Sequence, residues 1–167
     1  MNALPAPRVL HKDGRLLDDH WHVLRETEGY DHALPTLLPL ATYLREDVSQ
    51  RLGVWLAPGD DLQRLNERIP ALPLIAIDFA KLADGRGYSL ATLLRTRLQY
   101  LGELRAIGEV LVDQVFMLRR VGFSSFALRA DQSIEVARAA LTRYSNSYQT
   151  AADGELPAFR HRAAVAA

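Results

Sequence analysis

The residues best suited to chemistry follow the apolar segments in the middle of the chain, where strands are expected to end. In parallel α/β proteins, functional groups gather beyond the carboxyl ends of the strands. Arginines at such a place could hold an oxyanion through charge-assisted hydrogen bonds, helped by a helix N-terminus at Ser89. The candidate polar cluster consists of Asp78, Asp84, Arg86, Tyr88, Ser89, Arg105, Glu109, Asp113, Gln114 and Arg129.

Asp78 is the most informative member of this cluster. It lies in the otherwise apolar segment 74–79, and a carboxylate there costs free energy unless it is paired. We expect its partner to be Arg86 or Arg105. A purely structural interpretation stays open, in which Asp78 forms a local cap or ion pair and the arginines lie at turns and solvated strand ends. Neither interpretation assigns a catalytic residue.

The elements that would position these residues alternate between strand and helix. Apolar runs predict strands at 37–42, 54–57, 74–79 and 103–107 and within 123–128. Helices are predicted at 43–52, about 60–68 with Asp60 or Asp61 as its cap, 90–100 with Ser89 as its cap, 109–121 and 132–144. The helix at 90–100 has an apolar face that includes Leu94 and Leu101. Repeated βα units indicate an α/β fold with a parallel sheet, either open or partly closed like a TIM barrel.

The N-terminal part adds a β-hairpin. Asp13-Gly14 lies between apolar runs within residues 8–24, which is a strong hairpin signal. We expect the hairpin to cover one edge of the sheet, because unpaired edges invite association. Residues 1–150 are expected to form a single domain, and residues 151–167 a flexible C-terminal tail.

Composition limits the classes of partner and compartment. Twenty basic residues balance twenty acidic ones, which disfavours nucleic acid and anionic membrane surfaces as partners. The chain contains no cysteine, so disulfides, thiolate-ligated iron–sulfur clusters and zinc ribbons are excluded. No apolar run approaches the ~20 residues of a membrane helix. We therefore expect a cytoplasmic protein.

Familiar cofactor and nucleophile motifs are missing from the sequence. Gly85 and Gly87 lack the third glycine of a dinucleotide fingerprint, and neither a phosphate-binding loop nor a nucleophile elbow is present. His20 and His22 flank Trp21, but two histidines are too few to predict a metal site. No cofactor can be identified from the sequence.

A dense set of motifs lies between Pro73 and Arg129. It comprises Ile77-Asp78-Phe79, Asp84-Gly85-Arg86-Gly87-Tyr88-Ser89-Leu90-Ala91, Leu94-Arg95, Gly102-Glu103-Leu104-Arg105-Ala106-Ile107-Gly108, Val110-Leu111, Asp113-Gln114 and Arg120-Val121-Gly122-Phe123. In these motifs the chain resembles a bacterial family of unknown function, numbered nine hundred and thirty-four among such families. A looser likeness at Asp19, Trp21 and Gly53-Val54 extends it over roughly residues 8 to 145.

This resemblance implies a role in sulfur assimilation, because genes of the family typically lie beside those for assimilatory sulfite reductase. Two functions follow as expectations. The first is an accessory protein that binds or supports the sulfite reductase hemoprotein. The alternative is an oxidoreductase, as family members are often labelled, or an oxyanion-binding enzyme with Tyr88 as proton donor and a cofactor that the sequence does not identify. A homodimer is a further expectation.

Overall fold

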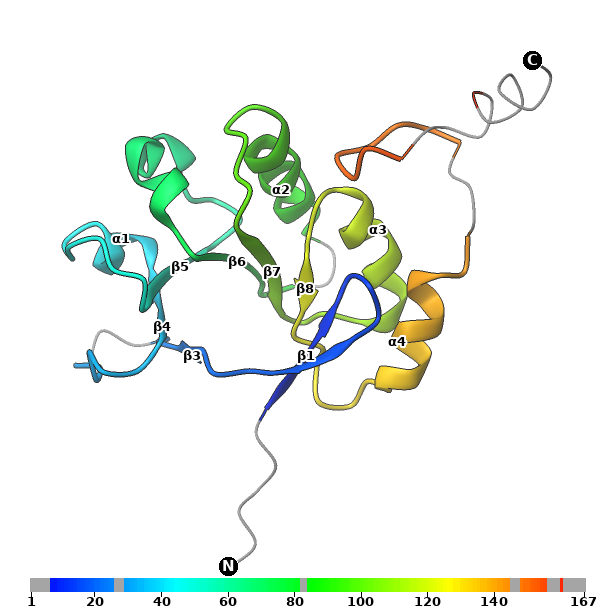
Figure 1. Cartoon of the computed structure of the whole chain (residues 1–167), viewed down its shortest axis with the longest axis horizontal. Helices are drawn as coiled ribbons and strands as arrows, with labels where there is room; N and C mark the ends of the chain where they lie inside the picture. Colours follow the sequence, from blue (N-terminus) through cyan, green and yellow to red (C-terminus); the bar gives the residue numbers. More distant parts are fainter. Residues whose placement is uncertain (1–6, 26–28, 82–83, 145–147, 156–159, 161–167) are drawn as a thin grey trace, which may run out of the picture.

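The described part of the chain forms one mixed sheet. The computed structural model describes residues 7–25, 29–81, 84–144, 148–155 and 160, and within them eight strands lie in the order β2-β1-β8-β7-β6-β5-β4-β3 (Figure 1). Strands β3 to β8 are parallel, and β1 pairs antiparallel with both β2 and β8. The strands are β1 (Arg8–His11), β2 (Leu16–Asp18), β3 (His22–Val23), β4 (Thr36–Pro39), β5 (Leu52–Leu56), β6 (Leu74–Phe79), β7 (Glu103–Gly108) and β8 (Ser125–Phe126).

The sheet must curl, because its two outermost strands are almost adjacent in the sequence. β2 and β3 lie at opposite edges, yet only residues 19–21 separate them. Such a link spans about 14 Å at most, whereas a flat sheet of eight strands would be about 34 Å wide. The sheet is accordingly an open half-barrel. We call residues 19–25 the strap, because they run from the β2 edge to the β3 edge (Figure 1).

The helices pack against one face of this half-barrel. They are α1 (Leu40–Tyr43), α2 (Arg86–Thr96), α3 (Val115–Arg120) and α4 (Ile134–Leu141), with the 3₁₀ turns η1 (Leu62–Arg64), η2 (Asn66–Ala71) and η3 (Val112–Gln114). Ala91, Leu94, Leu118 and Leu141 join the large core with the outward-facing strand residues. Burial of this continuous apolar surface is the main stabilising contribution.

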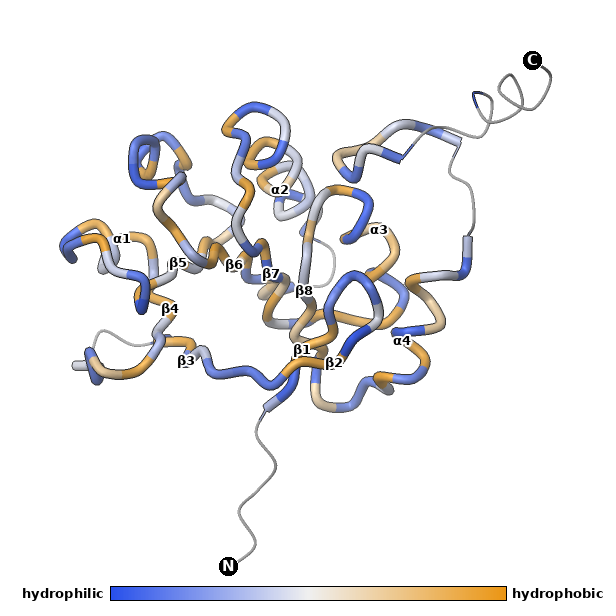
Figure 2. Tube along the Cα trace, viewed as in Figure 1, coloured by the Kyte–Doolittle hydropathy of each residue, from blue (hydrophilic) through white to orange (hydrophobic). Residues whose placement is uncertain are grey.

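The other face of the sheet holds a second, smaller core. Leu37, Leu74, Ala76 and Ile107 are buried there, against partly buried residues that include Trp21 and Trp55. Trp21 comes from the strap, which is otherwise mostly hydrophilic in Figure 2. β6 is buried at all six positions, as a strand covered on both faces should be. The strap therefore provides part of the cover that a full barrel would supply.

Several predicted elements differ from the structure. The prediction of a helix over 43–52 is wrong: α1 ends at Tyr43, and Val48 is 49% exposed, so the segment has no buried face to stabilise a helix. The stretch predicted as a helix from about 60 to 68 forms the short turns η1 and η2, although Asp61 caps η1 by accepting the Gln63 N–H at 2.9 Å. The parallel arrangement and the antiparallel β1–β2 hairpin are confirmed. The TIM-like repeat stays a prediction.

Two further predictions concern the chain ends and membranes. In the segment expected to be a flexible tail, Asp153 forms a 2.7 Å ion pair with Arg120 of α3; the flexibility of the whole segment and the single-domain boundary stay predictions. No helix within the described ranges is long and apolar enough to cross a bilayer.

Candidate functional site

The carboxylate of Asp78 is held at the carboxyl end of β6 by the strap. Arg25 donates two hydrogen bonds to it, of 2.5 and 2.9 Å, in a bidentate ion pair. The Asp78 side chain is 10% exposed and that of Arg25 is 48% exposed. Bidentate guanidinium–carboxylate pairs are among the strongest polar contacts in proteins. The prediction that Asp78 has a partner is confirmed, but the expectation of Arg86 or Arg105 is wrong.

Trp55 fixes the position of Arg25. The guanidinium carbon of Arg25 lies 5.2 Å from the centroid of the Trp55 ring, a distance that allows a cation–π interaction. The Trp55 indole N–H donates to the backbone oxygen of Leu24 at 2.8 Å. Both contacts fasten the strap to β5. Trp55 thus has a polar role besides the core role that its strand position indicates.

Gly108 brings the end of β7 close to Asp78. Its φ is +89°, and a Cβ at this position would lie 2.6 Å from Asp78 Oδ1 and 2.8 Å from the Phe79 oxygen. Only glycine combines that backbone conformation with so close an approach. This requirement explains why a glycine ends the strand.

Arg105 lies in the middle of β7, opposite Ala76, and its guanidinium contacts residues at the amino ends of the strands instead of Asp78. It is 4% exposed, and its guanidinium contacts Asp19 of the strap at 2.6 Å and Glu103 at 2.8 Å. Its Nε also lies 3.2 Å from the hydroxyl of Ser125. The interpretations of Arg105 as part of the cleft at the carboxyl ends and as a solvated strand end are therefore both wrong. Arg105 fastens the beginning of the strap, as Asp78 fastens its end.

Asp84 and Arg86 pair with each other at the start of α2. Arg86 Nη2 donates to Asp84 at 2.7 Å, and Asp84 also accepts the backbone N–H of Arg86 at 3.1 Å. The Arg86 guanidinium, with that backbone donor, lowers the pKa of Asp84 to about 2. Asp84 thus satisfies a free N–H of the first turn, as a capping residue does.

Ser89 and Tyr88 lie inside α2 rather than before it. The prediction of Ser89 as N-cap is wrong, because α2 begins at Arg86 and Gly85 occupies the cap position. The Tyr88 ring packs edge-on against Phe79, with centroids 5.6 Å apart. Burial raises the pKa of the Tyr88 hydroxyl, which makes it a weaker proton donor near neutral pH.

Glu109, Arg129 and Asp131 form a third paired group, beyond β7 and β8. Arg129 donates to Glu109 at 2.7 Å and to Asp131 at 2.7 and 2.8 Å. These bonds raise the pKa of Arg129 and lower that of Asp131 to about 2. Asp113 is exposed in η3, and Gln114 Oε1 accepts the Leu111 N–H at 2.9 Å. The candidate polar cluster is therefore a row of separate pairs, and Arg105 lies outside it.

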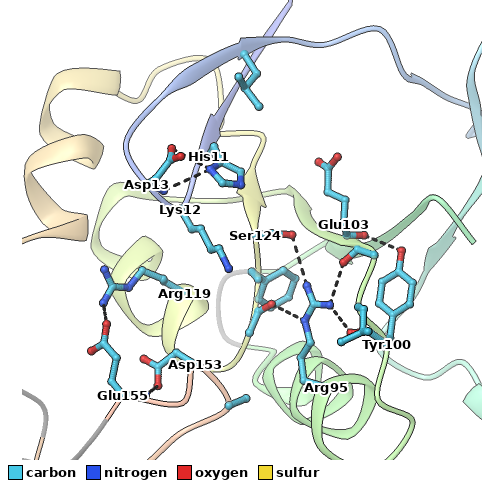
Figure 3. Close-up of a pocket in the computed structure, with 16 residues that line it drawn as sticks. His11, Lys12, Asp13, Arg95, Tyr100, Glu103, Arg119, Ser124, Asp153 and Glu155 are labelled. Carbon is cyan, nitrogen blue, oxygen red and sulfur yellow. Dashed lines mark hydrogen bonds and ion pairs between the residues drawn. The ribbon is translucent and has the colours of Figure 1, made fainter. Parts of the chain in front are cut away.

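A cleft lies at the amino ends of the strands, away from the candidate polar cluster. It has a volume of about 930 Å³ and lies between the β1–β2 turn, the α2–β7 connection, the α3–β8 connection and residues 152–155 (Figure 3). We call it the hairpin cleft. The residues that line it are His11, Lys12, Asp13, Leu17, Arg95, Tyr100, Leu101, Gly102, Glu103, Arg119, Gly122, Phe123, Ser124, Ala152, Asp153 and Glu155.

Arg95 forms one wall of the hairpin cleft. Its guanidinium donates to the backbone oxygens of Tyr100, Gly102 and Gly122, the latter two at 2.9 and 2.8 Å. Burial lowers the pKa of Arg95, but the group stays charged because an arginine pKa lies far above neutrality. Gly122, with φ +106°, leaves room for it, since a Cβ there would lie 2.4 Å from Arg95 Cγ. Arg95 was not among the candidate site residues, although the Leu94-Arg95 motif belongs to the family resemblance.

Metal ligation is not supported within the described ranges. No group of three or more His, Cys, Asp or Glu side chains is close enough there to hold a metal ion. His20 and His22 both lie in the strap, and His22 belongs to β3, which pairs in parallel with β4 and is not part of the hairpin.

Comparison with known proteins gives one positive result. Neither a curated protein nor a solved structure matches the chain. The profile of a family described as bacterial protein of unknown function (DUF934) matches residues 53–159, which is well over half of the chain. This range includes every residue of the candidate polar cluster and the Arg95 wall of the hairpin cleft. The chain belongs to the DUF934 family of bacterial proteins.

Proposed function

We propose that this chain is an accessory protein of assimilatory sulfite reduction that binds the sulfite reductase hemoprotein. The chain belongs to the DUF934 family. The support for a link to sulfur assimilation is the gene neighbourhood beside sulfite reductase that the resemblance to this family implies. The observation that carries the accessory role is the Asp78–Arg25 pair. Asp78 is the carboxylate that the strand ends would offer for catalysis, but both of its oxygens accept hydrogen bonds from the Arg25 guanidinium, so it is not free to act as an acid or base.

The neighbouring groups support the same conclusion. Arg86 is bound by Asp84, and Arg129 by Glu109 and Asp131. Pairing of this kind holds carboxylates ionised and guanidinium groups occupied, whereas a general acid or base needs a pKa near the working pH. The pKa of about 2 for Asp84 and Asp131 is far from that range. These residues are better suited to stabilising the strand ends than to proton transfer.

Sedimentation velocity at the heme absorbance tests this proposal. The purified chain would be mixed with the hemoprotein at tens of micromolar. We expect the heme signal to move to a heavier species. An unchanged heme boundary at these concentrations would contradict the proposal.

An oxyanion-binding enzyme or oxidoreductase with an unidentified cofactor is the second candidate. It is favoured by the presence of Arg25, Arg86 and Arg129 at the carboxyl ends of the strands, where each side chain is at least 40% exposed. Calorimetric titration with sulfite would detect such a site, and Arg86→Ala should abolish binding, whereas the exposed Arg97 gives a matched Arg97→Ala control. Unchanged binding in Arg86→Ala, or a purified protein without a flavin spectrum, would count against this candidate.

We further propose that the chain forms a homodimer, because no strand among the described residues pairs with the outer side of β2 or of β3, which lie at the two edges of the sheet. Both are short, which limits the area that edge pairing can bury. Light scattering at micromolar concentration should give twice the chain mass of 18.7 kDa. A monomeric mass would contradict the dimer without affecting the hemoprotein proposal.

A further inference from the structure

Lys12 is placed in the hairpin cleft by a backbone contact to the strand beside it. Its N–H donates to the backbone oxygen of Ser124 at 2.9 Å. The Lys12 side chain extends from this anchor into the cleft, between Arg119 on one side and Ser124 and Arg95 on the other (Figure 3). Among the described residues, no carboxylate forms an ion pair with the Lys12 ammonium group.

The carboxylates that line the cleft are each engaged by an arginine. Asp153 pairs with Arg120, and Glu103 shares Arg105 with Asp19. Asp13 pairs with Arg15 and Glu155 with Arg119. The other cation in the cleft, Arg95, is bound by backbone oxygens, which carry no net charge. Lys12 and Arg95 together outweigh the second carboxylate on Arg105, so the balance of charge in and around the cleft is positive, and its complement is an anionic group.

The rim of the cleft exposes large apolar side chains. Leu101 is 96% exposed and Leu17 is 38% exposed. The expectation that Leu101 lies on the apolar face of the helix before it is wrong, because α2 ends at Thr96 and Leu101 belongs to the connection to β7. Leu101 and Leu17 line the same cleft, so one apolar side chain of a partner could cover both on association. A free inorganic anion would leave them in water.

From this arrangement we propose that the hairpin cleft receives an acidic segment of a protein partner. A partner carboxylate meets Lys12, and an adjacent apolar side chain of the same segment covers Leu101 and Leu17. The volume of about 930 Å³ is of the size that accommodates a few side chains. Naming the hemoprotein as this partner rests on the proposed function, and the cleft then identifies where the complex forms.

The chain offers a matched control for Lys12, because it has only one other lysine. Lys81 is exposed and follows β6 at the carboxyl ends of the strands, away from the hairpin cleft. Lys12→Glu and Lys81→Glu therefore make the same change of charge at opposite ends of the sheet. Binding of each variant to the hemoprotein would be measured by sedimentation at the heme absorbance. We expect Lys12→Glu to weaken binding about tenfold or more, while Lys81→Glu stays within about twofold.

A zero-length cross-link gives a second readout. A carbodiimide joins a lysine amine to a partner carboxylate only when the two are in contact. Peptide mapping of the treated complex should recover the hemoprotein linked to Lys12 and not to Lys81. Leu101→Asp, which changes an exposed side chain and should leave folding intact, is expected to weaken binding about fivefold or more.

The outcomes separate this inference from the proposed function. If the wild-type chain binds the hemoprotein and both lysine variants bind equally well, the cleft is not the interface although the accessory role stands. If the wild-type chain does not bind the hemoprotein, the proposed function is wrong. The inference about the cleft is then tested separately, by measuring binding of a labelled peptide of alternating Glu and Leu to the chain. Saturable peptide binding that Lys12→Glu removes would support the inference, and no binding would overturn it. Complete displacement of the peptide by millimolar sulfite or sulfate would replace it by a small-anion site.

Discussion

The two ends of the parallel strands use their charged groups differently. At the carboxyl ends, Arg25, Arg86 and Arg129 each bind a carboxylate. At the amino ends, the buried Arg105 is paired in the same way, but Lys12 in the hairpin cleft has no carboxylate partner within the described ranges. Paired groups contribute to stability and an unmatched group is available for binding.

This difference shows the limit of a positional rule. Functional groups of parallel α/β proteins gather at the carboxyl ends of the strands, and this rule selected the candidate polar cluster. Here the hairpin, which pairs antiparallel with β8, places its turn at the amino ends and builds a cleft there. Substitutions of paired charged residues should therefore change stability and not partner binding, while substitutions of Lys12 or Leu101 in the hairpin cleft should do the reverse.

The largest loss of stability is expected from Arg105→Ala. The substitution leaves Asp19 and Glu103 without their buried partner and releases the beginning of the strap from β7. We expect the free energy of unfolding to fall by about 3 kcal/mol in urea denaturation. Arg97→Ala, at an exposed position, should change it by less than about 0.5 kcal/mol. Equal effects of the two substitutions would show that the buried network adds nothing to stability.

A somewhat smaller loss is expected from Gly108→Ala. The new Cβ would lie 2.6 Å from Asp78 Oδ1 at a φ of +89°, so it would disturb the Asp78–Arg25 pair and strain the backbone. We expect a loss of about 2 kcal/mol. Gly85→Ala is the control, because a Cβ there meets nothing within 4 Å and φ is −72°. If both variants unfold at the same urea concentration, the close approach is not a constraint.

The Asp78–Arg25 pair should show a measurable coupling in a double-mutant cycle. Asp78→Ala, Arg25→Ala and the double variant would be compared by urea denaturation. We expect a coupling of about 1–2 kcal/mol, at the lower end for charged hydrogen bonds because Arg25 is half exposed. Hemoprotein binding should be unchanged in Arg25→Ala. A coupling indistinguishable from zero would mean that the strap is held by Trp55 and Asp19 alone.

The smallest expected effect is a dependence on acidic pH. The pKa of Asp131 is lowered to about 2 by Arg129, compared with about 3.9 in an unfolded chain. The stability that Asp131 contributes is complete above the unfolded pKa and is lost as pH falls toward the folded one. Between pH 5 and pH 3, Asp131→Asn should therefore lose stability less steeply than the wild type. Parallel curves from urea unfolding would contradict the ion pair.

Local sequence patterns predicted the buried strands, which are apolar along their length, and the tight turn, which has a characteristic residue pair. The continuous apolar run of β6, the strand β7 and the Asp13-Gly14 turn were identified from such patterns. The two residues of β3 were not, because His22 and Val23 become a strand only by pairing with β4. The exposed position of Val48 likewise could not be read from the helix-like spacing around it.

The candidate site was harder to predict, because its contacts join distant segments. Asp78 and Arg25 are 53 positions apart, and Arg105 and Asp19 are 86 apart, so no local spacing links them. The need of Asp78 for a partner followed from its apolar strand, whereas the identity of that partner depended on the path of the strap. Lys12 gave no signal beyond its place in a turn, where lysines are common.

Hydrogen–deuterium exchange of the chain, measured with and without the sulfite reductase hemoprotein, tests the central claim most directly. It reports on both ends of the strands in one experiment. We predict that the hemoprotein slows exchange at residues 11–17, 100–103 and 152–155, the segments that form the hairpin cleft, and leaves residues 78–81, 84–86 and 108–110 unchanged. Protection confined to the carboxyl ends of the strands, or no protection at saturating hemoprotein, would contradict it.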